Sequence, residues 1–275
     1  MLGVSIKYPK KRAFVTGAAS GFGKAICALL AADGWKLAMC DVNKERLKEA
    51  AREMEALGGT AYEYVLDVTD RKAYQKVIAA FVEETGGVDL VFNNAGVAGG
   101  GAFGEFSLED WDWLIDINLM GVVNGCHFFT PILKGQRSGH IINTASAAAL
   151  FPVPNMTAYC CAKTAVKMLS EVMHNELVDY GIGVSVVMPE FFQTNLWENT
   201  RGGNAKEAKA MITKAKYTAD DVARHTLACV AASDLWITFP KFVRMLWWIG
   251  RFSPTLLNKL LRSQAQARLK KHTGG

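Results

Sequence analysis

The 275-residue sequence lacks long apolar segments, and this bears on where the protein is expected to work. It contains no run of eighteen apolar residues, which is about the length that a helix needs to cross a bilayer. Its first ten residues contain no apolar stretch of the kind found in secretory signals. We therefore expect a cytoplasmic protein that meets a membrane, if at all, at its surface.

Metal-ligand spacings, disulfide patterns and internal repeats are absent too. The five histidines are scattered, and the six cysteines show none of the paired spacings of a zinc site. A reducing compartment would keep these cysteines as thiols, most of them in the core. We predict no metal site. No repeat, low-complexity tract or linker divides the chain, so the composition indicates one domain.

Strand-like and helix-like stretches alternate along the chain, as βαβ units require. Seven short apolar runs are predicted to be strands, near residues 12–17, 36–41, 61–66, 88–93, 139–145, 183–188 and 235–239. Half of the residues are apolar, which is enough to bury a full core. The order predicts an α/β fold with a Rossmann-type doubly wound parallel sheet, as a single dinucleotide-binding catalytic domain over residues 1–240.

A glycine-rich turn follows the first predicted strand. Gly17, Gly21 and Gly23 precede an apolar helical stretch, and glycines there let the backbone approach a pyrophosphate at the helix start. The second predicted strand ends in Asp41, about 20 residues beyond the glycines. A carboxylate there would bind the ribose hydroxyls and repel a 2′-phosphate, which favours NAD over NADP as the cofactor.

Tyr159 and Lys163 are four residues apart in a predicted helix, so their side chains should share one face. A neighbouring ammonium favours the charged form of a phenol and would lower its pKa from about 10. Ser146 ends the fifth predicted strand, where a hydroxyl faces the ligand crevice of an open α/β sheet. The three residues together predict a site that exchanges a proton with an alcohol.

In these motifs and their order, residues 10 to 240 resemble the short-chain dehydrogenase/reductase (SDR) family. Residues 16–23 match its Thr-Gly-x-x-x-Gly-x-Gly pattern, residues 93–96 match its Asn-Asn-Ala-Gly loop, and Asn118 falls at its helix asparagine. The resemblance implies a catalytic set of Tyr159, Lys163, Ser146 and Asn118, and a homodimer or homotetramer. It implies cofactor contacts at Gly17, Ser20, Gly21, Phe22, Gly23, Asp41, Asp67, Val68, Asn94, Ala95, Gly96, Tyr159, Lys163, Pro189, Phe192 and Thr194.

The expected reaction follows from these groups. In the oxidation direction the Tyr159 phenolate takes the alcohol proton while a hydride leaves the same carbon for the nicotinamide. Ser146 would bind the substrate oxygen, and Asn118, by resemblance, would hold a relaying water. The segments 147–156 and 190–216 fall at the family's pocket and lid, and their apolar residues favour a hydrophobic secondary alcohol or ketone over a sugar.

Two alternatives to this assignment stay open. An NADPH-dependent carbonyl or 3-oxoacyl thioester reductase would use the same residues, although Asp41 and the absence of Arg or Lys at positions 20 and 42 argue against NADPH. A non-catalytic nucleotide-binding protein would not need the catalytic set. The chain also has Glu190 where the family usually has glycine after the proline, and that side chain either faces solvent or lines the pocket.

The excess of positive charge is concentrated in the tail, residues 241–275. Eight basic residues and no acidic residue follow Asp234, although the net formal charge of the whole chain is only +5. Apolar residues lie between them, which predicts a basic, amphipathic extension of two helices separated at Ser253. Three functions are consistent with this pattern: a lid or subunit interface, contact with an anionic membrane surface, or a solvated end. No nucleic-acid fold accompanies the basic residues, so we expect no nucleic-acid partner.

Overall fold

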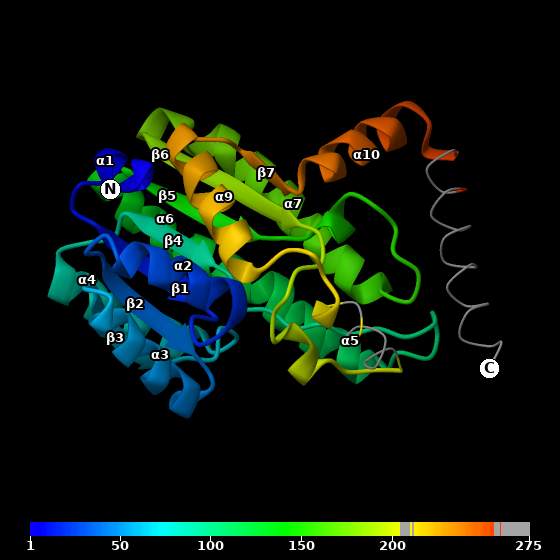
Figure 1. Ribbon diagram of the computed structural model, residues 1–275, viewed down its shortest axis with the longest axis horizontal. Helices are drawn as coiled ribbons and strands as arrows, with labels where there is room; N and C mark the ends of the chain where they lie inside the picture. Colours follow the sequence, from blue (N-terminus) through cyan, green and yellow to red (C-terminus); the bar gives the residue numbers. More distant parts are fainter. Residues whose placement is uncertain (204–209, 211, 256–258, 260–275) are drawn as a thin grey trace.

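Seven parallel strands form the centre of the molecule in the computed structural model, which describes residues 1–203, 210, 212–255 and 259 (Figure 1). The strands are β1 Arg12–Thr16, β2 Lys36–Asp41, β3 Thr60–Val65, β4 Leu90–Asn93, β5 Gly139–Thr144, β6 Ile182–Pro189 and β7 Trp236–Phe239. β1 and β4 are buried throughout, because helices cover both faces of the sheet. All seven predicted strands are confirmed, with ends that differ by no more than two residues.

The strand order is β3-β2-β1-β4-β5-β6-β7. The chain runs outward from β1 to β3, then returns to the other side of β1 and runs outward again to β7. This reversal lies between β1 and β4, and open α/β sheets bind ligands at that point, beyond the carboxyl ends of the strands. The predicted doubly wound fold in one domain is confirmed, and its topology locates the site before any side chain is considered.

Helices cover the sheet in two layers (Figure 1). The helices are α1 Gly3–Lys7, α2 Gly21–Ala31, α3 Lys44–Ala56, α4 Arg71–Thr85, α5 Leu108–Ile115, α6 Gly121–Gln136, α7 Thr157–Leu177, α9 Ala219–Ala232 and α10 Lys241–Phe252. One apolar cluster joins α2, α3 and α9 to the sheet, and a second joins α4, α6 and α7 to its other face. Capping side chains begin several helices, among them Asp70 at α4 and Thr218 at α9.

A buried ion pair ties the start of β1 to the residue before β4. The Arg12 guanidinium donates to both oxygens of Asp89, through Nε at 3.0 Å and Nη2 at 2.9 Å. Both side chains are almost wholly removed from solvent. Paired, bidentate hydrogen bonding is what makes such burial tolerable, and it fixes the register of the two strands that flank the reversal point.

The C-terminal extension begins as predicted, with an amphipathic helix. α10 runs from Lys241 to Phe252 and packs against β7, where the rings of Trp236 and Trp247 are 4.7 Å apart. The second predicted helix falls mostly on residues outside the described ones. Within the described part of the chain, no helix combines the length and the apolar character needed to cross a bilayer.

Candidate active site

The glycine-rich turn joins the end of β1 to the start of α2 at the reversal point. Gly17 and Gly21 have φ values of +66° and +52°, which favour glycine over any residue with a side chain. A Cβ at Gly23 would collide with the Gly17 carbonyl, so this position requires glycine for close packing. Ser20 is the N-cap residue of α2, and its side chain makes no capping hydrogen bond. The turn thus presents bare backbone at a helix N-terminus, as a pyrophosphate requires.

Thr16 holds the loop after β4 against this turn. Its Oγ1 accepts hydrogen bonds from the backbone N–H groups of Asn94, at 2.9 Å, and Ala95, at 3.0 Å. The Asn94 amide in turn donates to the Thr16 carbonyl at 2.9 Å. The predicted cofactor residues Asn94, Ala95 and Gly96 therefore lie beside the glycines. We did not assign Thr16 to the site from sequence, although it is the first residue of the family pattern.

Asp41 ends β2 and points to the same turn. Its Oδ2 accepts from the backbone N–H of Ala19 at 3.1 Å, and its Oδ1 accepts from the N–H of Asn43 at 3.0 Å. Asp67 and Val68 follow β3 along the same sheet edge. Asp67 is exposed and accepts two hydrogen bonds from Thr69, whereas the side chain of Val68 is buried. The residues predicted to contact the adenosine therefore lie next to one another along one edge of the sheet.

The four predicted catalytic residues meet at the carboxyl ends of β4 and β5. Helix α7 carries Tyr159 and Lys163 on one face, with the lysine Nζ 5.7 Å from the tyrosine ring centroid. The same Nζ donates to the Thr144 carbonyl at 2.9 Å, at the end of β5. Ser146 hydrogen-bonds the Tyr159 hydroxyl through its side chain. Its Oγ also accepts from the Ala148 N–H at 3.2 Å, so the serine is fixed in place.

Asn118 joins the set from the other side of the loop after β4. It is fully buried in a one-turn π-helix, Asp116–Met120, a distortion that is frequent at functional sites. Its amide accepts from the Val97 N–H at 2.9 Å and donates to the Val97 carbonyl at 2.8 Å. A Cβ at Gly96 would lie 2.7 Å from Asn118 Oδ1 and 3.6 Å from Lys163 Nζ. Gly96 therefore lies between the side chains of Asn118 and Lys163.

The pKa of Tyr159 is shifted in the direction opposite to the one expected from sequence. Burial raises the pKa of Tyr159 to about 12, and the hydrogen bond from Ser146 offsets this only in part. Burial also lowers the pKa of Lys163 to about 8. The physical reason is the apolar cluster around the phenol, which includes Phe106, Met156 and Ala162 and disfavours any charge. Sequence spacing revealed the ammonium but not this cluster.

The segment after β6 closes over the glycine-rich turn. Pro189 is the last residue of β6, and the ring of Phe192 packs against that of Phe22, 6.2 Å away. The Thr194 side chain lies where a Cβ on Gly21 would be. Of these predicted cofactor contacts, Phe192 and Thr194 therefore lie next to the turn. Glu190 is exposed, which agrees with the first of its two interpretations.

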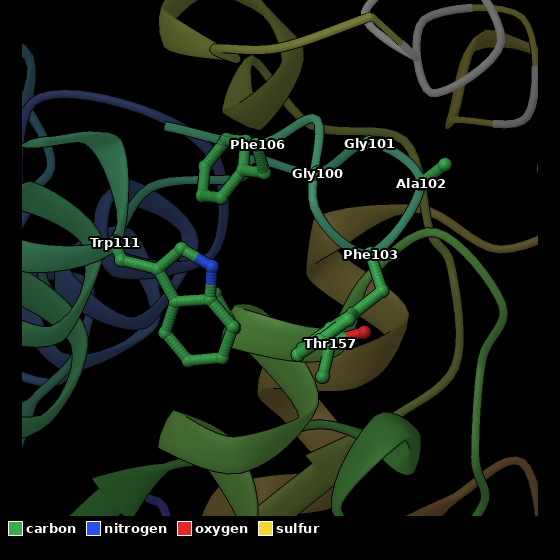
Figure 2. A pocket seen from close by; sticks show the side chains of 8 residues that line it. Gly100, Gly101, Ala102, Phe103, Phe106, Trp111 and Thr157 are labelled. Carbon is green, nitrogen blue, oxygen red and sulfur yellow. The ribbon is translucent and has the colours of Figure 1, made fainter. Parts of the chain in front are cut away.

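A small pocket lies between the loop after β4 and the start of α7, at the residues that lead into Tyr159 (Figure 2). Figure 2 shows the rings of Phe106 and Trp111 on one side and Phe103 with Thr157 on the other. Thr157 and Ala158, which directly precede Tyr159, complete it. From sequence we predicted a substrate wall at residues 147–156 and 190–216, and the residues that line this pocket lie outside both segments. The aromatic residues of this segment gave no signal in the sequence that separated them from ordinary core.

Arg201 lies in the segment predicted to be a lid, residues 190–216, and contacts the residues around this pocket. Its backbone carbonyl accepts from the Gly100 N–H at 3.1 Å, and its guanidinium lies 4.1 Å from the centre of the Trp113 ring. It also pairs with Asp110 at 3.2 Å. In the described part of the chain, no three His, Cys, Asp or Glu side chains come close enough to hold a metal ion.

Comparison with known proteins gives consistent results. The family described as short chain dehydrogenase matches residues 11–205. The probable oxidoreductase EphD of Mycobacterium tuberculosis is 37% identical over 187 residues, which are 68% of this chain but only 32% of EphD. The 3-oxoacyl-[acyl-carrier-protein] reductase FabG of Thermotoga maritima is 36% identical over 188 residues, or 68% of this chain and 76% of FabG. A short chain dehydrogenase/reductase from Burkholderia phymatum, solved in complex with NAD, is 31% identical with a TM-score of 0.85, over 90% of this chain and 94% of that one.

Proposed function

The chain belongs to the short chain dehydrogenase family, and we propose that it is an NAD-dependent oxidoreductase that interconverts a hydrophobic secondary alcohol and its ketone. The observation that carries the proposal is the convergence of Tyr159, Ser146 and Lys163 at the edge of an apolar cluster. We propose the catalytic and cofactor-binding roles of the individual residues as part of this function.

The residues at the reversal point fit a dinucleotide. Gly17, Gly21 and Gly23 leave the start of α2 bare, and the Asp41 carboxylate lies beside the turn, where a ribose would meet it. Asn94, Ala95 and Gly96 border the same space. NAD, when bound, would supply the hydride acceptor at its nicotinamide, next to Lys163 and Thr194. A carboxylate at position 41 favours NAD because it would repel the 2′-phosphate of NADP.

The chain's own residues would handle the proton. In ketone reduction the Tyr159 hydroxyl, protonated at neutral pH because burial raises its pKa to about 12, donates to the substrate oxygen. In alcohol oxidation the phenolate accepts that proton. Ser146 Oγ already accepts from Ala148, which leaves its hydrogen for the phenol or the substrate oxygen. Lys163 would hold the nicotinamide ribose and favour the phenolate as charge develops. Asn118 fixes the loop at Val97, and its expected role in holding a relaying water stays a prediction.

The apolar cluster around Tyr159 supports a hydrophobic substrate. Phe106 and Met156 are buried in it, and Trp111 and Val153 pack against its edge. A pocket of this kind gains binding energy from apolar groups, whereas sugar hydroxyls would lose their hydrogen bonds to water there. A screen of hydrophobic secondary alcohols with NAD, followed by absorbance of the reduced cofactor, tests the proposal. Tyr159→Phe protein serves as the control.

A second candidate is an NADPH-dependent carbonyl or 3-oxoacyl thioester reductase, favoured by the similarity to FabG. The two candidates differ in cofactor and direction, so the screen should include ketones and 3-oxoacyl thioesters with NADH and NADPH. Faster thioester reduction with NADPH than any reaction with NAD or NADH would select the second. The proposal for NAD rests on Asp41.

We also propose that the protein acts as a homodimer or homotetramer in the cytoplasm. Met168 and Val172 lie four residues apart on α7, with 56% and 46% of their surfaces exposed, which gives that helix an outward apolar stripe. Such a stripe is typical of a subunit interface. Light scattering on the purified chain gives the mass directly, and a monomer at micromolar concentration would contradict the proposal.

A further inference from the structure

Helix α10 has two apolar faces, and within the described part of the chain only one of them packs against another element. The inner face holds Val243, which is buried, and Trp247, which contacts Trp236 of β7. The outer face includes Met245, 57% exposed, and Phe252, 81% exposed. Figure 1 shows α10 extending away from the sheet at the edge of the molecule.

The outer face is continuous along the helix. Phe242, Met245, Trp248 and Phe252 recur every three or four residues, so they lie on one side of α10. The rings of Trp248 and Phe252 stack at 5.9 Å, which keeps both on that side. Large apolar side chains gathered at the surface mark an interaction site, because single exposed residues would not be aligned in this way.

Basic side chains border this face. Lys241, Arg244 and Arg251 are exposed, and no acidic residue follows Asp234 anywhere in the chain. Lys241 and Arg244 lie in the first turn of α10, which contains no acidic residue. Cations at a helix N-terminus oppose the helix dipole and cost stability. Helix formation therefore explains Arg251, in the last turn, but not Lys241 and Arg244, for which an anionic partner outside the molecule would account.

We infer that α10 docks in the plane of an anionic lipid bilayer, with Phe242, Met245, Trp248 and Phe252 at the acyl boundary and the basic residues among the headgroups. Aromatic and aliphatic groups on one side of a helix with cations beside them match this surface. The inference concerns localisation and does not depend on the substrate or on catalysis.

Two other occupants fit the helix less well. A lid over the active site would need α10 to contact the pocket, but its packing partner among the described elements is β7. A second copy meeting this face about a two-fold axis would place α10 against α10, and so bring basic residues together with no carboxylate from the same segment. Both occupants are outcomes of the test below.

The test is sedimentation of the full chain with vesicles of phosphatidylcholine, with or without phosphatidylglycerol. Binding should require the anionic lipid and should weaken as salt rises, because headgroup attraction is screened. Arg244→Glu with Arg251→Glu should lower the affinity at least tenfold. Trp248→Ser with Phe252→Ser should do so too, and its remaining binding should be more sensitive to salt. Ile6→Ser, which removes an exposed aliphatic side chain from α1, is the matched control and should bind like wild type.

Three results would overturn the inference. The first is no binding of the wild-type chain to anionic vesicles. The second is binding that both double variants retain, which would assign it to residues other than α10. The third is a fall in oligomer mass of the Trp248→Ser, Phe252→Ser protein by light scattering without vesicle binding by wild type, which would identify α10 as a contact between copies. Circular dichroism and NAD binding establish that each variant is folded.

Discussion

The carboxylate of Asp41 accepts a hydrogen bond from the backbone N–H of Ala19 at 3.1 Å, and so joins the end of β2 to the glycine-rich turn. This contact directs the charge toward the space between strand and turn. Asp41→Asn keeps an acceptor oxygen but removes the charge. We expect the preference for NAD over NADP to fall by on the order of tenfold, the equivalent of 1.4 kcal/mol, as repulsion of the 2′-phosphate is lost. Calorimetric titration of both cofactors measures it.

A gain of affinity provides the complementary test. Val42 is exposed next to Asp41, and Val42→Arg would place a guanidinium there, so NADP should bind more tightly. If wild-type protein binds NADP more tightly than NAD, or if neither substitution changes the ratio, Asp41 does not select the cofactor.

Gly96 should tolerate no side chain, because it separates Asn118 from Lys163. In Gly96→Ala the new Cβ would lie 2.7 Å from Asn118 Oδ1, and the buried asparagine is held in place by two hydrogen bonds to Val97. We expect kcat/KM to fall by at least tenfold, with weaker NAD binding. Gly135→Ala in α6 is the matched control, since no atom lies within 4 Å of its added Cβ. It should leave activity unchanged, and equal losses in both variants would refute this role for Gly96.

Trp111 should affect substrate binding more than the chemical step, because it lines the pocket and is not one of the four proposed catalytic residues (Figure 2). Trp111→Ala should raise the KM of a bulky hydrophobic alcohol by roughly tenfold and change kcat less, as expected when a pocket loses apolar contact. Trp248→Ala removes the same side chain from α10 and should leave KM unchanged in vesicle-free buffer. A fall in kcat alone for Trp111→Ala would argue against this pocket as the substrate site.

The buried ammonium of Lys163 should destabilise the folded protein at neutral pH. Burial lowers its pKa from 10.5 to about 8, so the folded protein bears the cost of a buried ammonium below pH 8. A shift of that size corresponds to about 3 kcal/mol, less about 1 kcal/mol for the hydrogen bond to Thr144. Lys163→Met should therefore raise the free energy of unfolding at pH 7 by about 1–3 kcal/mol while abolishing activity.

The sign of the pH dependence follows from proton binding. Between pH 8 and 10.5 the unfolded chain holds a proton at Lys163 that the folded protein lacks, so wild-type stability gains on the methionine variant as pH rises. Urea unfolding of both proteins at pH 7 and 9.5 measures the difference. A variant that is less stable at pH 7, or a gap that widens toward pH 9.5, would show that the ammonium is stabilised in its pocket.

The sequence was sufficient for the sheet because strands buried on both faces are continuous apolar runs. It was sufficient for much of the site because turn glycines, Asp41 and the Tyr159–Lys163 spacing are local features. It was insufficient where several segments meet. The pKa of Tyr159 depends in part on Phe106, which lies far from it in sequence, and the pocket wall at Phe103 and Trp111 has no local signature.

The central claim is that Tyr159 is the proton-transferring group, and the initial rate of NADH formation from a hydrophobic secondary alcohol tests it directly in wild-type and Tyr159→Phe protein. Removing a general acid–base group lowers a rate by on the order of 10²- to 10⁴-fold. We predict a loss in that range while the dissociation constant for NAD changes little, because the variant lacks only the hydroxyl that Ser146 contacts. A phenylalanine variant that turns over at nearly the wild-type rate would contradict the account.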